Sequence, residues 1–271
     1  MESDVLGRLW PISSRQHPLI KSLRAAFSQA ALTHDGDCAL EGAHLLEEAI
    51  RAGLRLRAVV FSQSAGDLAR KLLPQLGAHV DTLVVPDEVF ASAVATETPQ
   101  GVAALVKLRE FSLEDVLRSS EGLIVVAAGL QDPGNLGTLL RSAEAFGAAG
   151  VLLGERTVRH FNPKAIRASA GSVFRLPVVQ VELEGALATL RARGVRLLAT
   201  SSHKGTRLDE ADLSGAVAIL IGNEGAGLPR GVLASTDGVL AIPHSPRVES
   251  LNAGIAASIV LYEAARQRRR L

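Results

Sequence analysis

The stretch that decides the fold is "IPHSPRVESLNAGIAASI", residues 242–259. Its second half is apolar enough to predict a buried helix over residues 250–266. Two polar residues open this helix, directly after a proline-rich turn. We expect Ser250 to cap the helix N-terminus and Asn252 to occupy the second helical position. Capping accounts for Ser250, but it leaves the side-chain amide of Asn252 without partners for its hydrogen bonds.

The second half of the chain alternates strand and helix signals. Near-continuous apolar strands between helices favour a parallel sheet that is covered on both faces. We expect strands at residues 123–129, 150–153, 177–181, 196–200, 217–221 and 239–242. We expect helices at residues 135–146, 163–170, 184–193, 229–234 and 250–266.

The first half predicts a compact α/β/α unit. Its expected strands are residues 38–42, 57–62, 82–86 and 102–108, and its expected helices are residues 15–33, 43–53 and 65–76. Polarity then rises, which is typical of a linker. The sequence therefore predicts one domain at residues 1–108, a linker at 109–121 and a second domain at 122–271.

Composition excludes several classes of protein. A hydrophobic fraction of 47% excludes a disordered chain, and a net charge of +1 gives no global field that attracts nucleic acid. Arginine makes up 24 of the 29 basic residues, which suits phosphate binding but also follows from a GC-rich genome. Cys38 is the sole cysteine, so we expect no disulfide and no metal site. Without a signal peptide or a membrane-spanning run, we expect a soluble, cytoplasmic protein with no membrane partner.

Polar residues also follow another buried strand, in "GLQDPGNLGTLLRSAEAFG", residues 129–147. Asn135 is the expected N-cap of the helix that follows. Arg141 points away from the apolar stripe of that helix. Taken alone, a cap and a solvated helix face explain both residues.

A glycine-rich loop follows a third strand, in "AVAILIGNEGAGLP", residues 216–229. Glycines such as Gly222 let a ligand approach the backbone closely. A dinucleotide-binding loop is the rival interpretation, but the third glycine of that pattern is missing. Glu224 would also place a negative charge beside a pyrophosphate. The loop is better suited to a cationic or hydroxyl-bearing ligand.

In this order and spacing, the three stretches resemble the SpoU-type (TrmH-like) RNA 2′-O-ribose methyltransferases of the SPOUT superfamily. The motifs that carry the resemblance are "NLGTLLRSAEAFG", "LIGNEGAGLP" and "IPHSPRVESLNAGIAASI". The first half is similar to the RNA-binding domain of rRNA-modifying members, a fold shared with ribosomal proteins that bind kink-turns. That similarity rests on "SSRQHPLIKSL", "ALEGAHLLEEAI" and "TPQGVAALV".

The resemblance implies an α/β fold whose C-terminal SPOUT domain forms a trefoil knot around the cofactor S-adenosyl-L-methionine. It implies a homodimer that forms through this domain, with each active site completed by the partner subunit. Residues implied to hold the cofactor are Thr200, Gly222, Ile242 and Leu251. Residues at the family's catalytic positions are Asn135, Arg141, Glu224, Ser250 and Asn252.

Methyl transfer needs an in-line approach of the ribose 2′-oxygen to a sulfonium methyl group, so positioning should dominate. The family proposal makes Arg141 the base that removes the 2′-proton. A free guanidinium has a pKa of roughly 12.5–13.8, which favours a clamp for phosphate and developing alkoxide instead. Both roles stay open. Glu224 and Asn252 would orient Arg141 or the ribose, and Asn135 would fix the nucleotide or the loop.

The substrate is expected to be RNA. Candidate contacts are Arg15, Lys21, Arg156, Arg159, Lys164 and Arg167, although a solvated basic face explains them equally well. With 3% aromatic residues, recognition of phosphates and shape is favoured over base stacking. The N-terminal domain favours 23S-type rRNA over tRNA, since minimal tRNA-modifying relatives lack it. The alternatives are a tRNA 2′-O-methyltransferase and an inactive RNA-binding protein of the same fold.

Overall fold

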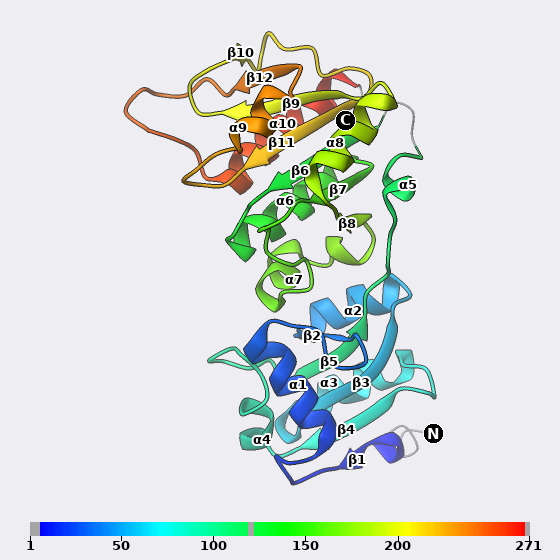
Figure 1. The fold of residues 1–271 in the computed structure, drawn as a ribbon. Coiled ribbons are helices and arrows are strands. Elements are labelled where there is room, and N and C mark those ends of the chain that lie inside the picture. The colour runs from blue at the N-terminus through cyan, green and yellow to red at the C-terminus, as the bar shows by residue number, and fades with distance from the viewer. Residues whose placement is uncertain (1–5, 119–121, 269–271) are drawn as a thin grey trace. The chain divides into compact units, whose positions relative to one another are not determined.

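The computed structural model describes residues 6–118 and 122–268. They form two compact units, each a sheet flanked by helices (Figure 1). The first unit comprises the described residues up to Arg109 together with Phe161–Phe174. The second unit comprises Glu110–His160 and the residues from Arg175 onward. The domain and linker boundaries expected from the sequence stay a prediction.

The first unit contains a five-stranded mixed sheet of order β1-β4-β3-β5-β2. Strands β1, β4 and β3 run parallel, and β5 is antiparallel to both β3 and β2. The strands are β1 (Trp10–Pro11), β2 (Cys38–Glu41), β3 (Arg55–Ser62), β4 (Asp81–Val85) and β5 (Val102–Lys107). The short edge strand β1 was not expected, because two residues give no alternating pattern.

The helices of the first unit are α1 (Pro18–Gln29), α2 (Ala43–Arg51), α3 (Gly66–Leu72), α4 (Asp87–Ala91) and α7 (Pro163–Ser169). Helix α1 is shorter than expected, because Pro18 stands at its first position and Ala30 ends it in the left-handed conformation. Helices α1 and α4 share one core with the sheet through Ile20, Leu23 and Phe90. Cys38 is buried, and burial raises the pKa of its thiol to about 12, so it stays protonated.

The second unit contains a seven-stranded sheet of order β10-β12-β9-β11-β6-β7-β8, in which every pair is parallel. Its strands are β6 (Leu123–Ala128), β7 (Gly150–Leu153), β8 (Val178–Gln180), β9 (Arg196–Ser201), β10 (Thr206–Arg207), β11 (Val217–Gly222) and β12 (Gly238–Ala241). The expected parallel sheet is confirmed, with β10 as an added edge strand.

Helices cover both faces of the second sheet (Figure 1). They are α5 (Leu113–Val116), α6 (Pro133–Ala145), α8 (Leu183–Ala192), α9 (Arg230–Ala234) and α10 (Ala253–Gln267). Side chains of α5, α8 and α9 pack into one core with alternate residues of β6. Helix α5 lies inside the expected linker. The polar residues around it give no helical pattern in the sequence, yet its Val116 is fully buried.

Helices α6 and α10 run parallel and pack against each other in constant register. Each contact joins residues 116 or 117 positions apart, so α10 stays beside α6 along the length of α6. The contacts join Asn135 with Asn252, Thr138 with Gly254, Ser142 with Ser258, and Phe146 with Tyr262. This pairing places the N-termini of both helices side by side.

The structure corrects both helix caps expected from the sequence. Helix α6 begins at Pro133, and its N-cap is Asp132, whose carboxylate accepts a hydrogen bond from the Asn135 N–H at 2.8 Å. Helix α10 begins at Ala253, and its N-cap is Asn252 rather than Ser250. The Asn252 Oδ1 atom accepts the Ile255 N–H at 3.2 Å. Pro133 explains the first difference, since proline favours the first helical position and moves the cap back by three residues.

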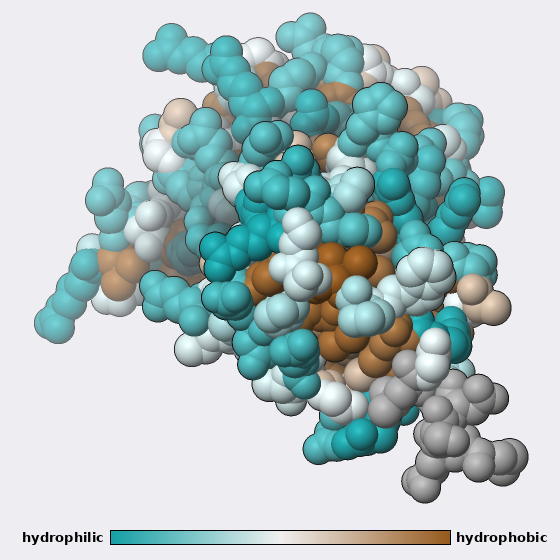
Figure 2. All heavy atoms as spheres, turned by 90° about the horizontal axis from the view of Figure 1, so that it is seen from below, coloured by the Kyte–Doolittle hydropathy of each residue, from teal (hydrophilic) through white to brown (hydrophobic). Residues whose placement is uncertain are grey.

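Large hydrophobic side chains are exposed on one face of α10. Ile255, Ile259 and Tyr262 are 52%, 36% and 49% exposed, at a spacing that places them in one stripe. Hydrophobic surface also occurs elsewhere: a view from below shows such an area near the centre of a mostly hydrophilic face (Figure 2). In the described ranges, no helix has the length and apolarity needed to cross a membrane.

The close approach of α6 and α10 predicts a stability effect at Gly254. A Cβ atom there would lie 3.1 Å from the Thr138 Cβ and 3.2 Å from the Asn135 carbonyl oxygen. We expect Gly254→Ala to lower the free energy of unfolding by about 1 kcal/mol, since overpacking outweighs the gain in helix propensity. Chemical denaturation measures this change.

Gly231 in α9 is the matched control. A Cβ atom at that position would meet nothing within 4 Å. Gly231→Ala should therefore raise the free energy of unfolding, by up to about 1 kcal/mol. Equal shifts in the two variants would contradict the requirement for a small residue at position 254.

Candidate active site

A chain of hydrogen bonds joins the three sequence motifs. The Asn252 Nδ2 atom donates to the Asn135 Oδ1 atom at 2.8 Å, and the Asn135 Nδ2 atom donates to the Glu224 Oε1 atom at 2.9 Å. These residues come from the start of α10, the first turn of α6 and the loop after β11. Three of the five residues expected at catalytic positions therefore form one connected group.

The direction of this chain follows from the chemistry of its members. Asn252 uses its Oδ1 atom to cap α10, so its Nδ2 atom is left to donate. Asn135 must then offer its oxygen to Asn252 and its NH₂ group to the next partner. Glu224 as a carboxylate can only accept, which makes it the correct partner at the end. Asn252, which capping by Ser250 left without a role, thus caps α10 and also connects to Asn135 and Glu224.

Helix dipoles reinforce the placement of Glu224. Because α6 and α10 are parallel, their positive N-terminal ends lie together, and Asn135 and Asn252 extend from them. Negative charge near a helix N-terminus is stabilised by roughly 0.3–1 kcal/mol per helix. The carboxylate of Glu224 therefore lies where the local field favours it.

Asn223 organises the loop that carries Glu224. Its Oδ1 atom accepts the N–H groups of Gly225 and Ala226 at 3.0 and 2.9 Å, and its Nδ2 atom donates to the Gly129 carbonyl at 2.9 Å. The loop then folds back so far that a Cβ atom at Gly222 would lie 2.5 Å from the Gly227 carbonyl carbon. Only glycine fits there. Asn223 was not among the residues expected from the sequence, although an asparagine directly after a glycine is a turn signal.

A cavity of about 360 Å³ lies beside this loop. It opens beyond the carboxyl ends of β9, β11 and β12, the edge at which parallel sheets bind ligands. All four residues expected to hold the cofactor line it, as do two expected catalytic residues: Thr200, Gly222, Ile242, Leu251, Glu224 and Ser250. The apolar side chains of the lining suit a flat base, and the exposed backbone of the loop suits the polar groups of a ligand.

His244 is a cavity residue that the sequence analysis did not single out. Its Nδ1 atom lies 2.7 Å from the Ile242 carbonyl oxygen, so Nδ1 carries the proton in the neutral ring. Its Nε2 atom is buried and has no hydrogen-bond partner within residues 6–118 and 122–268. The ring also stacks on His203, with centroids 5.3 Å apart. The cavity wall therefore carries an unused acceptor, which a bound cofactor can satisfy.

Arg141 lies apart from the hydrogen-bonded group. It is exposed on α6 and forms no hydrogen bond or ion pair with any residue that the structure describes. It follows Asn135 by six residues, which is about 9 Å along a helix axis. Ser250 lines the cavity but does not join the chain of hydrogen bonds. Among the described residues of one chain, Arg141 forms no hydrogen bond or ion pair with the other residues expected at catalytic positions.

The six candidate RNA contacts are all exposed, but they do not form one patch within a unit. Four belong to the first unit: Arg15, Lys21, Lys164 and Arg167. Arg15 pairs with Glu88 at 3.6 Å, which is a weak surface contact. Arg156 and Arg159 belong to the second unit and follow β7. Across the described residues, no cluster of three or more histidine, cysteine or acidic side chains could hold a metal ion.

Comparisons with known proteins agree with this geometry. Residues 122–262 match the model of the SpoU rRNA methylase family, and residues 17–104 match the MRM3-like substrate binding domain. The 23S rRNA (guanosine(2553)-2′-O)-methyltransferase RlmP of Bacillus subtilis is 31% identical over 93% of this chain and 97% of its own.

Two solved structures extend the similarity to the fold. The AdoMet-bound rRNA methyltransferase from Sinorhizobium meliloti has a TM-score of 0.83 and 30% identity, covering 98% of this chain and 99% of that one. The SpoU methyltransferase AviRb from Streptomyces viridochromogenes, in complex with AdoMet, has a TM-score of 0.82 and 27% identity, covering 94% and 99%. The expected α/β fold class is confirmed. The trefoil knot stays a prediction.

The two roles of Asn252 can be separated by substitution. Asn252→Asp keeps an oxygen for the Ile255 N–H but removes the donor to Asn135. Because Asp and Asn are equally good N-caps, we expect the free energy of unfolding of this variant to stay within a few tenths of a kcal/mol, about 0.3, of the wild-type value. Methyl transfer should fall roughly 100-fold, because the group that positions the reactants is broken. Denaturation and transfer of labelled methyl groups measure the two effects.

Asn252→Ala is the comparison variant, because it removes both hydrogen bonds. It should lose about 1 kcal/mol of stability in addition to activity. An Asn252→Asp variant that transfers methyl groups at the wild-type rate would show that capping is the whole role of this residue.

Proposed function

The chain belongs to the SpoU rRNA methylase family and is an S-adenosylmethionine-dependent RNA methyltransferase, and we propose that it methylates a ribose 2′-hydroxyl in 23S-type rRNA. The observation that carries the proposal is the Asn252–Asn135–Glu224 chain beside the cavity that Thr200, Gly222, Ile242 and Leu251 line. The match of residues 17–104 to a substrate-binding domain supports an rRNA substrate. We also propose a cytoplasmic location, which an rRNA substrate supports.

The proposed division of labour follows the expected domains. Residues 1–108 bind RNA, residues 109–121 link the domains, and residues 122–271 carry methyl transfer. Residues 1–5, 119–121 and 269–271 lie outside the described residues. Arg15, Lys21, Lys164 and Arg167 extend the RNA surface by contacting phosphates, which fix the position of the RNA without reading its sequence.

The residues that line the cavity fit the cofactor. Gly222 leaves the backbone open, and the buried His244 Nε2 atom offers an acceptor that no described residue uses. When bound, S-adenosylmethionine supplies an electrophilic methyl group. The residues of the chain then hold the ribose so that its 2′-oxygen attacks in line.

Glu224 and Arg141 divide the remaining chemistry. Glu224 has its Oε1 atom fixed by Asn135, so its second oxygen can accept the hydrogen bond of the ribose 2′-hydroxyl and orient it. The same Glu224 oxygen would take up the 2′-proton as the ribose 2′-oxygen accepts the methyl group that S-adenosylmethionine supplies. Arg141 clamps the adjacent phosphate and stabilises the developing alkoxide through the hydrogen bonds of its guanidinium group.

A homodimer brings Arg141 to the site in this proposal. The Ile255, Ile259 and Tyr262 stripe exposes apolar surface on α10, and Arg141 is exposed on the neighbouring α6. A second copy of the chain would bury the stripe against its own equivalent. Because Arg141 lies far along α6 from Asn135 of the same chain, we assign its catalytic contact to the site of the partner subunit.

The proposed function predicts the product of a direct assay. Labelled S-adenosylmethionine is incubated with the protein and with separate unmodified rRNA and tRNA pools, and ribose methylation is mapped. We expect one 2′-O-methylated nucleotide in 23S-type rRNA. Transfer to tRNA alone would replace the substrate assignment. Cofactor binding without transfer to any RNA would indicate an inactive RNA-binding protein.

Subunit complementation tests the origin of Arg141. Arg141→Gln and Asn252→Asp homodimers should both be inactive. In equal mixtures that exchange subunits, half of the dimers are mixed and each has one intact site if Arg141 acts in the partner's site. Activity should then recover to about a quarter of the wild-type value. No recovery, with exchange verified by mass spectrometry, would place Arg141 in the site of its own chain.

Ile259→Glu tests the apolar stripe independently. It places a charge in the centre of the proposed interface, where burial of an unpaired carboxylate is costly. Sedimentation should show a monomer, and methyl transfer should be lost while S-adenosylmethionine still binds. A dimeric Ile259→Glu variant would contradict the use of this surface.

A further inference from the structure

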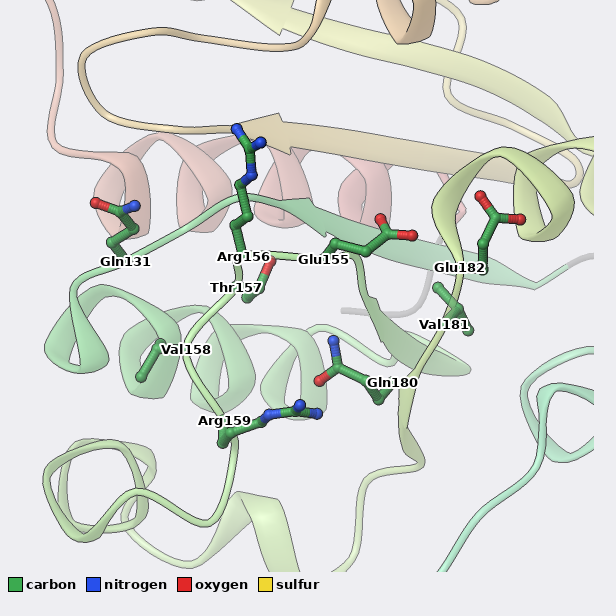
Figure 3. Close-up of a pocket in the computed structure, with 9 residues that line it drawn as sticks. All are labelled: Gln131, Glu155, Arg156, Thr157, Val158, Arg159, Gln180, Val181 and Glu182. Atoms are coloured by element: carbon green, nitrogen blue, oxygen red, sulfur yellow. The ribbon is translucent and has the colours of Figure 1, made fainter. Parts of the chain in front are cut away.

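A second pocket lies outside the proposed cofactor cavity. It has a volume of about 620 Å³, within the range of ligand-binding clefts, and all of its lining residues belong to the second unit (Figure 3). We call it the β7 pocket, because Glu155 to Arg159, which follow strand β7, form one wall. Gln131 closes one end, and Gln180 and Glu182 close the other (Figure 3).

The β7 pocket shares a wall with the proposed active site. The Gly129 N–H donates to the Thr157 Oγ1 atom at 2.9 Å, on the side of the β7 pocket. The Gly129 carbonyl accepts the Asn223 Nδ2 atom at 2.9 Å, on the side of the cofactor cavity. Two residues later, Gln131 lines the β7 pocket and directly precedes Asp132, the N-cap of α6. One short segment, Gly129 to Asp132, therefore borders both the β7 pocket and the proposed active site.

Most polar groups of the pocket are fixed by structural hydrogen bonds. Glu182 caps α8 by accepting the N–H groups of Glu184 and Gly185 at 2.9 and 2.7 Å. The Gln180 Nε2 atom donates to the Gly154 carbonyl at 3.1 Å, and Thr157 donates to the Ala127 carbonyl at 2.9 Å. These bonds make the walls rigid before any ligand arrives, which lowers the entropic cost of binding.

Three side chains of the pocket have donors or acceptors that no described residue uses. Arg156, Arg159 and Gln131 are exposed and form no hydrogen bond or ion pair with other residues of the described chain. In Figure 3, Arg159 extends towards Gln180, whereas Arg156 extends from the loop in another direction. Burial lowers the pKa of the neighbouring His160 to about 4, aided by the charge of Arg159, so the positive charge here belongs to the arginines.

The backbone at Arg156 supports a functional role. Its φ of 62° lies in the left-handed region, which is costly for any residue with a Cβ atom. Glycine would adopt this conformation without strain. An arginine therefore occupies a position where its backbone is unfavourable and its side chain makes no intramolecular bond. Strain of this kind is typical of a side chain aimed at a ligand.

We propose that the β7 pocket binds the unpaired nucleotide that neighbours the methylated one in the RNA. This inference rests on the proposed function. The two guanidinium groups suit phosphate oxygens and can stack on a base, and the free amide of Gln131 suits a base edge. The two glutamates in the lining disfavour a purely anionic ligand such as inorganic phosphate. A nucleotide, which has one negative charge on its phosphate and both donors and acceptors on its base and sugar, matches this mixed lining.

Arg156→Gly and Arg159→Gln test the pocket. Each removes one phosphate contact, and Arg156→Gly also removes the backbone strain, so its melting temperature should equal or exceed that of the wild type. With an unmodified 23S rRNA transcript, we expect KM to rise about tenfold in each variant. The value of kcat and the affinity for S-adenosylmethionine should stay within about twofold of the wild type.

The salt dependence of RNA affinity provides a readout that a structural role would not move. Each arginine removed from a phosphate should reduce the slope of log affinity against log salt by about 0.7. Arg193→Gln is the matched control. Arg193 lies between α8 and the start of β9, so it is at the amino ends of the strands, away from the β7 pocket, and it pairs with Glu114 at 3.0 Å. It should leave KM and the slope unchanged.

The outcomes separate this inference from the proposed function. Wild-type protein that methylates no RNA refutes the proposed function, while filter binding of the same transcript still tests the pocket. Unchanged RNA affinity and salt slope in both arginine variants overturn the pocket assignment. Altered sedimentation of the variants, with RNA affinity unchanged, also overturns it and indicates that a second copy of the chain docks there.

Discussion

The parallel pairing of α6 and α10 is the constraint on which the proposed active site depends. Two helices that keep constant register over four contacts bring their N-termini to one place. Gly254 and the Ser142–Ser258 hydrogen bond, at 2.7 Å, allow the close approach. A shift of one residue in register would rotate Asn252 by about 100° around its helix and separate it from Asn135. Helix packing therefore sets the geometry of the polar group.

The polar group in turn depends on a loop that the helices do not contain. Glu224 meets Asn135 because Asn223 folds the loop after β11 and ties it to the Gly129 carbonyl at the end of β6. Strands β6 and β11 are direct neighbours in the sheet, so this tie is short. The sheet order thus explains why residues 89 and 117 positions apart in the sequence share a hydrogen-bonded chain.

Much of this arrangement could be predicted from the sequence, because its signals are local. Apolar strands between helices predicted the parallel sheet. The resemblance to the SpoU-type family, rather than any local pattern, implied that Asn135, Arg141, Glu224, Ser250 and Asn252 share one site. Helix caps were predicted wrongly, since Asp132 and Asn252 rather than Asn135 and Ser250 occupy those positions. Several residues near each start can cap, and tertiary packing selects among them. The partner subunit's contribution, which Arg141 requires in our proposal, is equally absent from local patterns.

Residues with no apolar pattern were the hardest to assign. Arg156 and Arg159 form part of a basic run that a solvated face explains equally well, and only the fold shows that both line one rigid pocket. The left-handed backbone of Arg156 also has no signature in the sequence. The Gly129 backbone is hydrogen-bonded to Thr157 in the wall of the β7 pocket and to Asn223 in the loop that carries Glu224. A nucleotide in the β7 pocket would therefore contact residues that are bonded to the segment positioning Glu224. Substrate binding and alignment of the reacting hydroxyl are then coupled through one short piece of backbone.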